Sequence, residues 1–247
     1  YQTYYASISK GYKSGGFDGR STREVEPYDP ETMWAYEVGL NTTLPELKLV
    51  MNAALYHNIY SDIQLSSFSQ DSLGNFLPIF TNAGKAHISG LEFEMAYRPI
   101  DNLTLNGVVA ITDSGYENYI GSMGMDISDS RSLVNTPKHT AMFGWTYTMP
   151  SLISWAKLQF AGNIQYRSKT YLTVSSSEVL AQPDFALVNA LVRFEDRSEH
   201  WQFDLQAENL GGVEYRDHGF DLQESLGYQV GYYGQPRTFK LVLRFLD

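Results

Sequence analysis

Cysteine is absent from the 247 residues of this chain, which excludes disulfide frameworks and cysteine-ligated zinc sites. Basic residues are also scarce. The chain has 18 lysines and arginines against 28 acidic residues, for a net charge of −10, whereas a nucleic-acid-binding protein needs a basic patch. No run of about 18 apolar residues occurs, so the sequence offers no transmembrane helix. Membrane β-barrels escape this last exclusion, because their alternating strands average out on a hydropathy scale.

Patterns for catalysis or metal binding are lacking too. The five histidines show no metal-ligand spacing. The chain has no G-x-S-x-G, and KGYKSGG near residue 13 lacks the spacing of a phosphate-binding loop. Glu92 and Glu94 could act as a glycosidase carboxylate pair, but such neighbours more often line a wet surface. We therefore predict that the chain is not an enzyme and holds no cofactor or metal.

Aromatic residues, by contrast, are plentiful, with 18 Tyr, 13 Phe and 4 Trp. Many lie in alternating patterns, as in HWQFDLQAE (200–208), where every second residue is apolar. A period of two predicts a strand with one apolar and one polar face. Such a strand suits a soluble β-sandwich, in which the apolar face meets a second sheet. It equally suits a membrane barrel, in which that face meets lipid.

Ten long segments are predicted as strands, and the connections between them alternate in length. The strands are 2–13, 31–44, 47–64, 80–98, 102–112, 137–149, 154–168, 183–195, 200–211 and 237–246. The short connections are 44–47, 99–102, 150–154 and 195–199; the long ones are 14–30, 65–79, 113–136, 169–182 and 212–236. Most of the strands exceed the usual globular length and suit a tilted membrane crossing. Short turns on one side and long loops on the other are typical of outer-membrane barrels.

Several longer stretches can be compared with known families. They include PETMWAYEVGLNTTL, NAGKAHISGLEFE (82–94), ENLGGVEY (208–215) and GQPRTFKLVLRF. In order, and over essentially the whole chain, they resemble the C-terminal half of TonB-dependent outer-membrane receptors. The resemblance implies an all-β, antiparallel up-and-down transmembrane barrel of about 22 strands around an N-terminal plug domain. Residues 1–247 would supply about the last ten strands, without the plug.

Two structural expectations follow from this resemblance. The chain alone should form an open, curved sheet, with strands 2–13 and 237–246 as free edges that expose unpaired backbone groups. Family members usually end on an aromatic residue, whereas here Phe245 is followed by Leu246 and Asp247. The fold should be unaffected by this departure, although insertion into the membrane could be less efficient.

The resemblance also implies a function, a location and partners. The protein would be an active-transport receptor in the outer membrane of a Gram-negative bacterium. It would import a scarce nutrient, most commonly a ferric siderophore, with energy from TonB bound through the missing N-terminal region. Its partners would be outer-membrane lipid, the ligand and TonB, with no nucleic acid. A passive porin or small barrel channel, and a soluble β-sandwich binding module, remain as alternatives.

Binding groups are expected in two of the long loops, because loops on a rigid scaffold commonly carry binding residues. Aromatic rings supply rigid contact area, and arginine recognises anionic groups. The candidate ligand-binding residues are Tyr116, Tyr119, Arg131, Tyr215, Arg216, His218, Tyr232, Tyr233 and Arg237. On the polar strand face, we expect Glu92, Glu94, Asp204 and Glu208 to face the lumen, because carboxylates are costly to bury without a partner.

Overall fold

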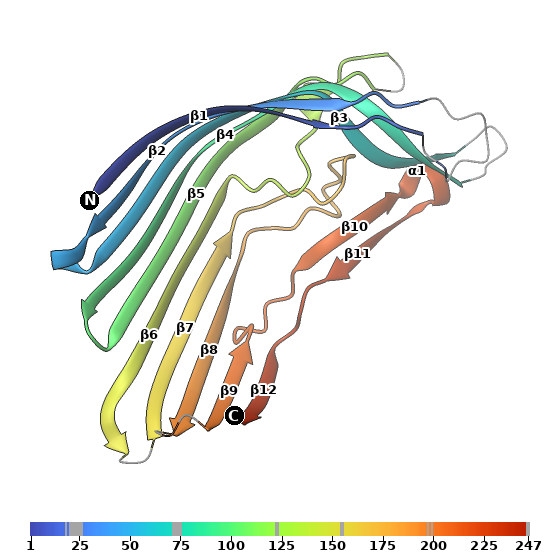
Figure 1. Ribbon diagram of the computed structural model, residues 1–247. Helices are drawn as coiled ribbons and strands as arrows, with labels where there is room; N and C mark the ends of the chain where they lie inside the picture. The colour runs from blue at the N-terminus through green and yellow to red at the C-terminus, as the bar shows by residue number, and fades with distance from the viewer. Residues whose placement is uncertain are drawn as a thin grey trace.

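The computed structural model describes residues 1–17, 19, 27–70, 76–121, 124–153, 156–196, 198 and 200–245. Parts of the predicted loops 14–30, 65–79 and 113–136 lie outside these residues, as do parts of the turns 150–154 and 195–199 and the last two residues, Leu246 and Asp247. Figure 1 shows a single strongly curved sheet whose long connections gather at one end and lie toward its concave side.

Ten antiparallel strands form this sheet, in the order β1 to β9 followed by β12. They are β1 (Gln2–Lys13), β2 (Glu31–Leu44), β3 (Leu49–Gln70), β4 (Phe76–Ile100), β5 (Leu103–Asn118), β6 (His139–Ile153), β7 (Ala156–Arg167), β8 (Phe185–Asp196), β9 (Trp201–Glu208) and β12 (Thr238–Phe245). All ten predicted strands are therefore present. In the part of the chain that the structure describes, β1 and β12 each pair on one side only, so the predicted open sheet is confirmed. The β-sandwich alternative is wrong, because the ten long strands form one curved sheet and not two packed ones.

Three predicted loops contain more regular structure than expected. Strand β3 continues to Gln70 and strand β4 begins at Phe76, so most of 65–79 is strand. The two strands extend this far because each supplies the other with hydrogen-bond partners. Strand β5 continues to Asn118. The stretch 212–236 holds a second sheet made of β10 (Arg216–Leu222) and β11 (Tyr228–Tyr233), joined by the short helix α1 (Gln223–Leu226). The described residues also include two short 3₁₀ helices, Pro45–Leu47 and Ser128–Ser130.

The two faces of the ten-stranded sheet differ as predicted. Register places apolar side chains in continuous rows, such as Leu205 between Val192 and Leu241. These side chains remain exposed in the chain by itself, and Leu241 is 69% exposed. The opposite, concave face carries the polar partners of the alternation. We call the apolar side the outer face and the concave side the inner face.

Aromatic residues mark both ends of the outer face. Tyr97 and Trp201 lie at the end with the short turns, and Trp34 and Tyr36 lie at the end with the long loops. Beyond the apolar rows the same face becomes charged, since Asp113 follows Ile111 on β5. An apolar band between two aromatic girdles is typical of a membrane barrel. No helix in the described residues is long and apolar enough to cross a membrane.

A small apolar core lies on the inner face, at the end with the long loops. Its buried members are Leu65, Ala83, Ala86, Tyr116 and Leu133, and Tyr119 and Val174 pack against them. The first four belong to β3, β4 and β5, whereas Leu133, Tyr119 and Val174 come from the β5–β6 and β7–β8 connections. These connections are therefore folded onto the inner face.

Candidate functional site

The described parts of connections 119–138, 168–184 and 209–237 cover the loop end of the inner face, and we call them the cover. The last of the three is pinned at its base by Asn209, which is 3% exposed and has a left-handed φ of 50°. Its side-chain amide donates to the carbonyl oxygens of Val213 (2.8 Å) and Gln235 (3.1 Å), and its Oδ1 accepts from the backbone N–H of Val213 (2.9 Å). Asparagine tolerates this φ and can satisfy nearby backbone groups. One side chain thus holds the two ends of the connection together.

From this base, the β10–β11 hairpin extends on the concave side of the sheet, and β10 and α1 reach β3 (Figure 1). Asp221 holds the hairpin to the β7–β8 connection, because it accepts a short hydrogen bond from the hydroxyl of Ser175. Gln229 donates both to Asp221 (3.0 Å) and to the hydroxyl of Ser177 (2.8 Å). The hairpin and the β7–β8 connection therefore share one polar network.

The β7–β8 connection also supports the hairpin through the side chain of Gln182 and the backbone of Ala181. The N–H of Arg216 donates to Oε1 of Gln182 (2.6 Å), and its guanidinium donates to the carbonyl oxygen of Ala181 (2.9 Å). Leu180, which is buried, packs against the hairpin at Gly219, where a Cβ would lie 3.4 Å from its side chain. Arg216 is thus occupied in holding the cover in place.

The candidates Tyr116, Tyr119 and Arg131 lie together. The rings of Tyr116 and Tyr119 are 5.1 Å apart between centroids. Tyr116 is buried within β5, so its predicted placement in a loop is wrong: pairing of β5 with β4 continues past that position. Burial raises the pKa of Tyr119, and the positive charge of Arg131 partly offsets the rise. Burial raises the pKa of Asp221, but hydrogen bonds from Ser175 and Gln229 hold it below its ordinary value, and the charge of Arg131 adds to this lowering. The charge of Arg131 thus acts on two of the three connections.

The remaining candidates lie on or beside the hairpin. His218, Phe220 and Tyr232 form an aromatic cluster, with centroid distances of 4.7 Å (His218–Phe220) and 5.8 Å (Phe220–Tyr232). Tyr232 is 51% exposed and Tyr233 is 63% exposed. The guanidinium carbon of Arg216 lies 5.9 Å from the centre of the Tyr233 ring. The hairpin therefore presents an accessible aromatic surface.

A hollow of about 740 Å³ lies at the base of the hairpin. It is lined by Gly212, Val213, Glu214, Tyr233, Gly234, Pro236 and Arg237. Tyr215 stacks on Phe185 with the centroids 4.8 Å apart, and its ring crosses Gly234, where a Cβ would lie 2.2 Å away. Tyr215 is thus a packing residue, whereas Tyr233 and Arg237 line a space that could hold a ligand.

The four carboxylates predicted to face the lumen lie on the inner face, and two of them are firmly paired. Asp204 has no exposed surface and accepts hydrogen bonds from Arg193 (2.8 and 3.0 Å) and Arg244 (2.9 Å). Glu208 accepts hydrogen bonds from Lys240 (2.8 and 2.9 Å). Glu92 and Glu94 are exposed. That these groups line the lumen of a closed barrel stays a prediction.

Sequence reasoning missed the contacts that hold the cover. Asp221, Ser175 and Gln229 carry no local signal, because their partners lie far away in the sequence. Asn209 does carry a local signal, since an asparagine before Leu-Gly-Gly suits a left-handed turn. In the described part of the chain, no cluster of three or more His, Asp or Glu residues could hold a metal.

The sheet, its two faces and the cover together can be compared with known proteins. A family model described as "TonB dependent receptor-like, beta-barrel" matches residues 1–210. The chain belongs to the TonB-dependent receptor family. Members of this family are outer-membrane β-barrels of Gram-negative bacteria and act as transport receptors, not enzymes. The resemblance predicted from the sequence is confirmed.

Individual relatives in this family are distant. The ferric-pyoverdine 358 receptor of Pseudomonas putida is 24% identical over 228 residues, which are 89% of this chain and 24% of the relative. The chain thus spans about a quarter of that protein. The ferric yersiniabactin uptake receptor of Yersinia pestis has a TM-score of 0.79 at 18% identity, over 99% of this chain and 35% of that one. A copper transporter has a TM-score of 0.72 at 17% identity, over 99% and 37%. The yersiniabactin receptor and the copper transporter therefore have the same fold as this chain over the matched part.

Proposed function

We propose that the chain is the C-terminal barrel portion of an outer-membrane receptor that imports a ferric siderophore with energy from TonB. Membership of the TonB-dependent receptor family supports this, as does the ferric-pyoverdine receptor that resembles the chain in sequence. The fold alone does not select the ligand, because a copper transporter shares it. The choice of ligand therefore depends on the residues of the cover.

The observation that carries the proposal is the gathering of aromatic and arginine side chains at the loop end of the inner face. Six of the nine candidates have side chains that could meet a ligand: Tyr119, Arg131, His218, Tyr232, Tyr233 and Arg237. Aromatic rings would give rigid contact area, and the arginines would pair with anionic groups of the ligand. Tyr116, Tyr215 and Arg216 would act indirectly, because they hold the core and the cover.

The same proposal assigns the two faces of the sheet. The outer face would meet lipid, because no part of the described chain covers its apolar rows. The inner face, with Glu92 and Glu94, would line a lumen filled by a plug domain. TonB would bind to the region that precedes this barrel portion in the whole receptor.

The test uses the full-length receptor with Tyr232→Ala and Tyr233→Ala together. The control is Tyr166→Ala, because Tyr166 is an exposed tyrosine on the outer face. Binding of a panel of hydroxamate, catecholate and mixed ferric siderophores is measured by fluorescence quenching, and iron uptake is measured in cells with and without TonB. We expect the double variant to lose about tenfold or more in affinity for the siderophore that binds, and the control to bind normally.

Two outcomes would contradict the proposal. If the double variant binds every siderophore of the panel as the unaltered receptor does, the hairpin is not part of the binding site. If uptake persists without TonB, the passive-channel alternative is favoured.

A further inference from the structure

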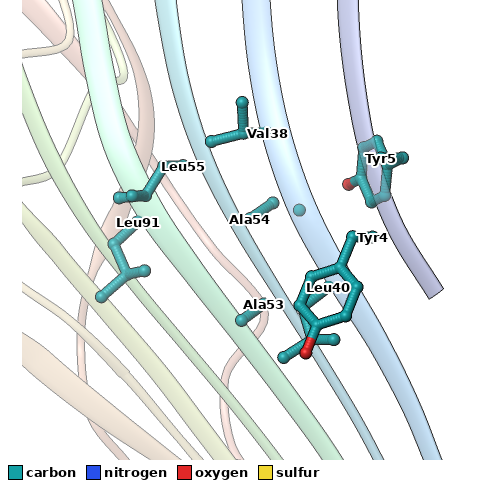
Figure 2. Close-up of a pocket in the computed structure, with 9 residues that line it drawn as sticks. Tyr4, Tyr5, Val38, Leu40, Ala53, Ala54, Leu55 and Leu91 are labelled. Atoms are coloured by element: carbon teal, nitrogen blue, oxygen red, sulfur yellow. The ribbon is translucent and has the colours of Figure 1, made fainter. Parts of the chain in front are cut away.

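The hollow at the base of the hairpin differs in its lining from a second hollow of the described chain. The second one, of about 420 Å³, lies between β1 and β4, and apolar side chains such as Leu40, Leu55 and Leu91 line it (Figure 2). The hollow at the hairpin base has the charged residues Glu214 and Arg237 in its lining. A polar ligand finds partners only in the latter, so the groups that fix its walls matter for binding.

Both walls of the hollow at the hairpin base are attached to Asn209. On one wall, the backbone oxygen of Asn209 accepts the N–H of Gly212 (2.8 Å), and its side chain binds Val213 through two hydrogen bonds. The other wall begins at Gln235, whose carbonyl oxygen accepts from the same side chain (3.1 Å). Arg237 follows two residues later, and its guanidinium lies 3.1 Å from the place of a Cβ at Gly212. The orientation of Asn209 therefore sets how the two walls face each other.

The backbone N–H of Asn209 does not take part in the ladder between β8 and β9. Asn209 has a left-handed φ of 50°, and the next residue, Leu210, donates to the carbonyl oxygen of Val188 (2.8 Å). The N–H of Asn209 donates instead to Oδ1 of Asn189 on β8 (2.9 Å). Since Asn209 is buried, loss of this acceptor would leave a buried donor without a partner, which is costly. The side chain of Asn189 thus takes the place of a ladder bond.

Asn189 is itself held in one orientation. It lies opposite Asn163 of β7, whose Oδ1 accepts hydrogen bonds from the amide nitrogens of Asn189 (2.9 Å) and Gln165 (3.1 Å). A side-chain amide has its donor and its acceptor on opposite branches, so donation to Asn163 turns the Oδ1 of Asn189 toward Asn209. A row of amides therefore runs from the inner face of β7 to the base of the cover.

We propose that Asn189 positions the cover for ligand binding without touching the ligand. It does not line the hollow, but through Asn209 it fixes the walls that carry Tyr233 and Arg237. Walls that are already in place bind more tightly, because less ordering is required when the ligand enters. Loss of the Asn189 amide therefore weakens binding and leaves the later transport step unchanged. The inference rests on the binding role that the proposed function gives to the cover.

The test uses the full-length receptor with two variants of Asn189. Asn189→Leu removes both hydrogen bonds at nearly constant size, whereas Asn189→Asp keeps an acceptor for the N–H of Asn209. Asn106→Leu is the matched control, because Asn106 lies on the inner face of β5 in the same row across the sheet. Hydrogen exchange at single-residue resolution reports the amides of Gly212 and Val213 without any ligand. Binding and uptake are then measured with the hydroxamate, catecholate and mixed ferric siderophores, and heat-modifiable migration on gels shows that each variant is folded.

We expect Asn189→Leu to speed the exchange of these two amides about fivefold and to weaken siderophore binding by about the same factor. The uptake rate at saturating siderophore should not change. Asn189→Asp should change exchange and binding only about twofold, because an acceptor remains, and Asn106→Leu should match the unaltered receptor.

Three results would overturn the inference. They are equal exchange at Gly212 and Val213 in Asn189→Leu and Asn106→Leu, equal effects of the two Asn189 variants, and unchanged siderophore binding in Asn189→Leu despite faster exchange. Failure of the receptor proposal looks different, because then no siderophore of the panel binds to the unaltered receptor. Hydrogen exchange, which needs no ligand, still decides in that case whether Asn189 positions the cover.

Discussion

In the ten-stranded sheet, the position of a residue along its strand determines which face its side chain lies on, because successive side chains point to opposite faces. In the cover, the surroundings of a side chain follow from single contacts between connections that are far apart in the sequence. Leu205 and Gln206 are neighbours in β9, yet they point to opposite faces. Asp221 instead depends on Ser175, which lies 46 positions away. The sheet should therefore tolerate changes that respect its alternation, whereas the cover should respond to the loss of one partner.

The largest effect should come from a charge on the outer face. Leu205→Arg should reduce the free energy of unfolding by about 2–4 kcal/mol if the residue lies near the middle of the membrane. Gln206→Arg, one residue away on the inner face, should cost far less. Urea titration of the full-length receptor in bilayers would measure both. Equal losses would mean that the two faces do not meet different environments.

A somewhat smaller effect is expected for Asp204→Ala on the inner face. The substitution would leave Arg193 and Arg244 side by side without the carboxylate that they share. Their side chains are 30% and 45% exposed, so water would compensate them in part, and we expect a loss of about 1–3 kcal/mol. Glu208→Ala is the control, because its pair with Lys240 is much more exposed. The same urea titration should show a clearly smaller loss for the control.

In the cover, Asn209→Ala should act locally. The side chain makes three hydrogen bonds that join the start and the end of the β9–β12 connection, and their loss should cost about 1–2 kcal/mol. Limited proteolysis should then cut within 213–235 faster, while the sheet remains protected. Asn209→Asp keeps the acceptor for the N–H of Val213, so its rate of cutting should lie between those of the unaltered receptor and of Asn209→Ala. Cutting that is no faster in Asn209→Ala would show that other contacts hold the base.

The same contrast explains what could be predicted from the sequence. The strands, their two faces and the open edges follow from a period of two and from connection lengths, which are local signals. The β10–β11 hairpin was missed because its strands are short and Gly227, in a left-handed conformation with φ of 79°, interrupts the pattern. The sequence predicts a loop at Tyr116 because the apolar run of β5 ends before the strand does. Beyond that run, pairing with β4 and packing in the small core sustain the strand, and neither is visible in local sequence.

The smallest effect expected is a pH dependence of the hairpin through Asp221. Burial by itself raises the pKa of this carboxyl, but hydrogen bonds from Ser175 and Gln229 outweigh burial and hold the pKa below its ordinary value of 3.8. The carboxylate therefore stabilises the docked hairpin fully above pH 3.8, and this stabilisation disappears as the pH falls through the lowered pKa. Hydrogen exchange of the β10–β11 amides, corrected for intrinsic rates, should reveal opening at low pH. In Asp221→Asn the additional opening at low pH should vanish, because no charge is left to titrate. If the variant and the unaltered receptor open alike as the pH falls, another group controls the docking of the hairpin.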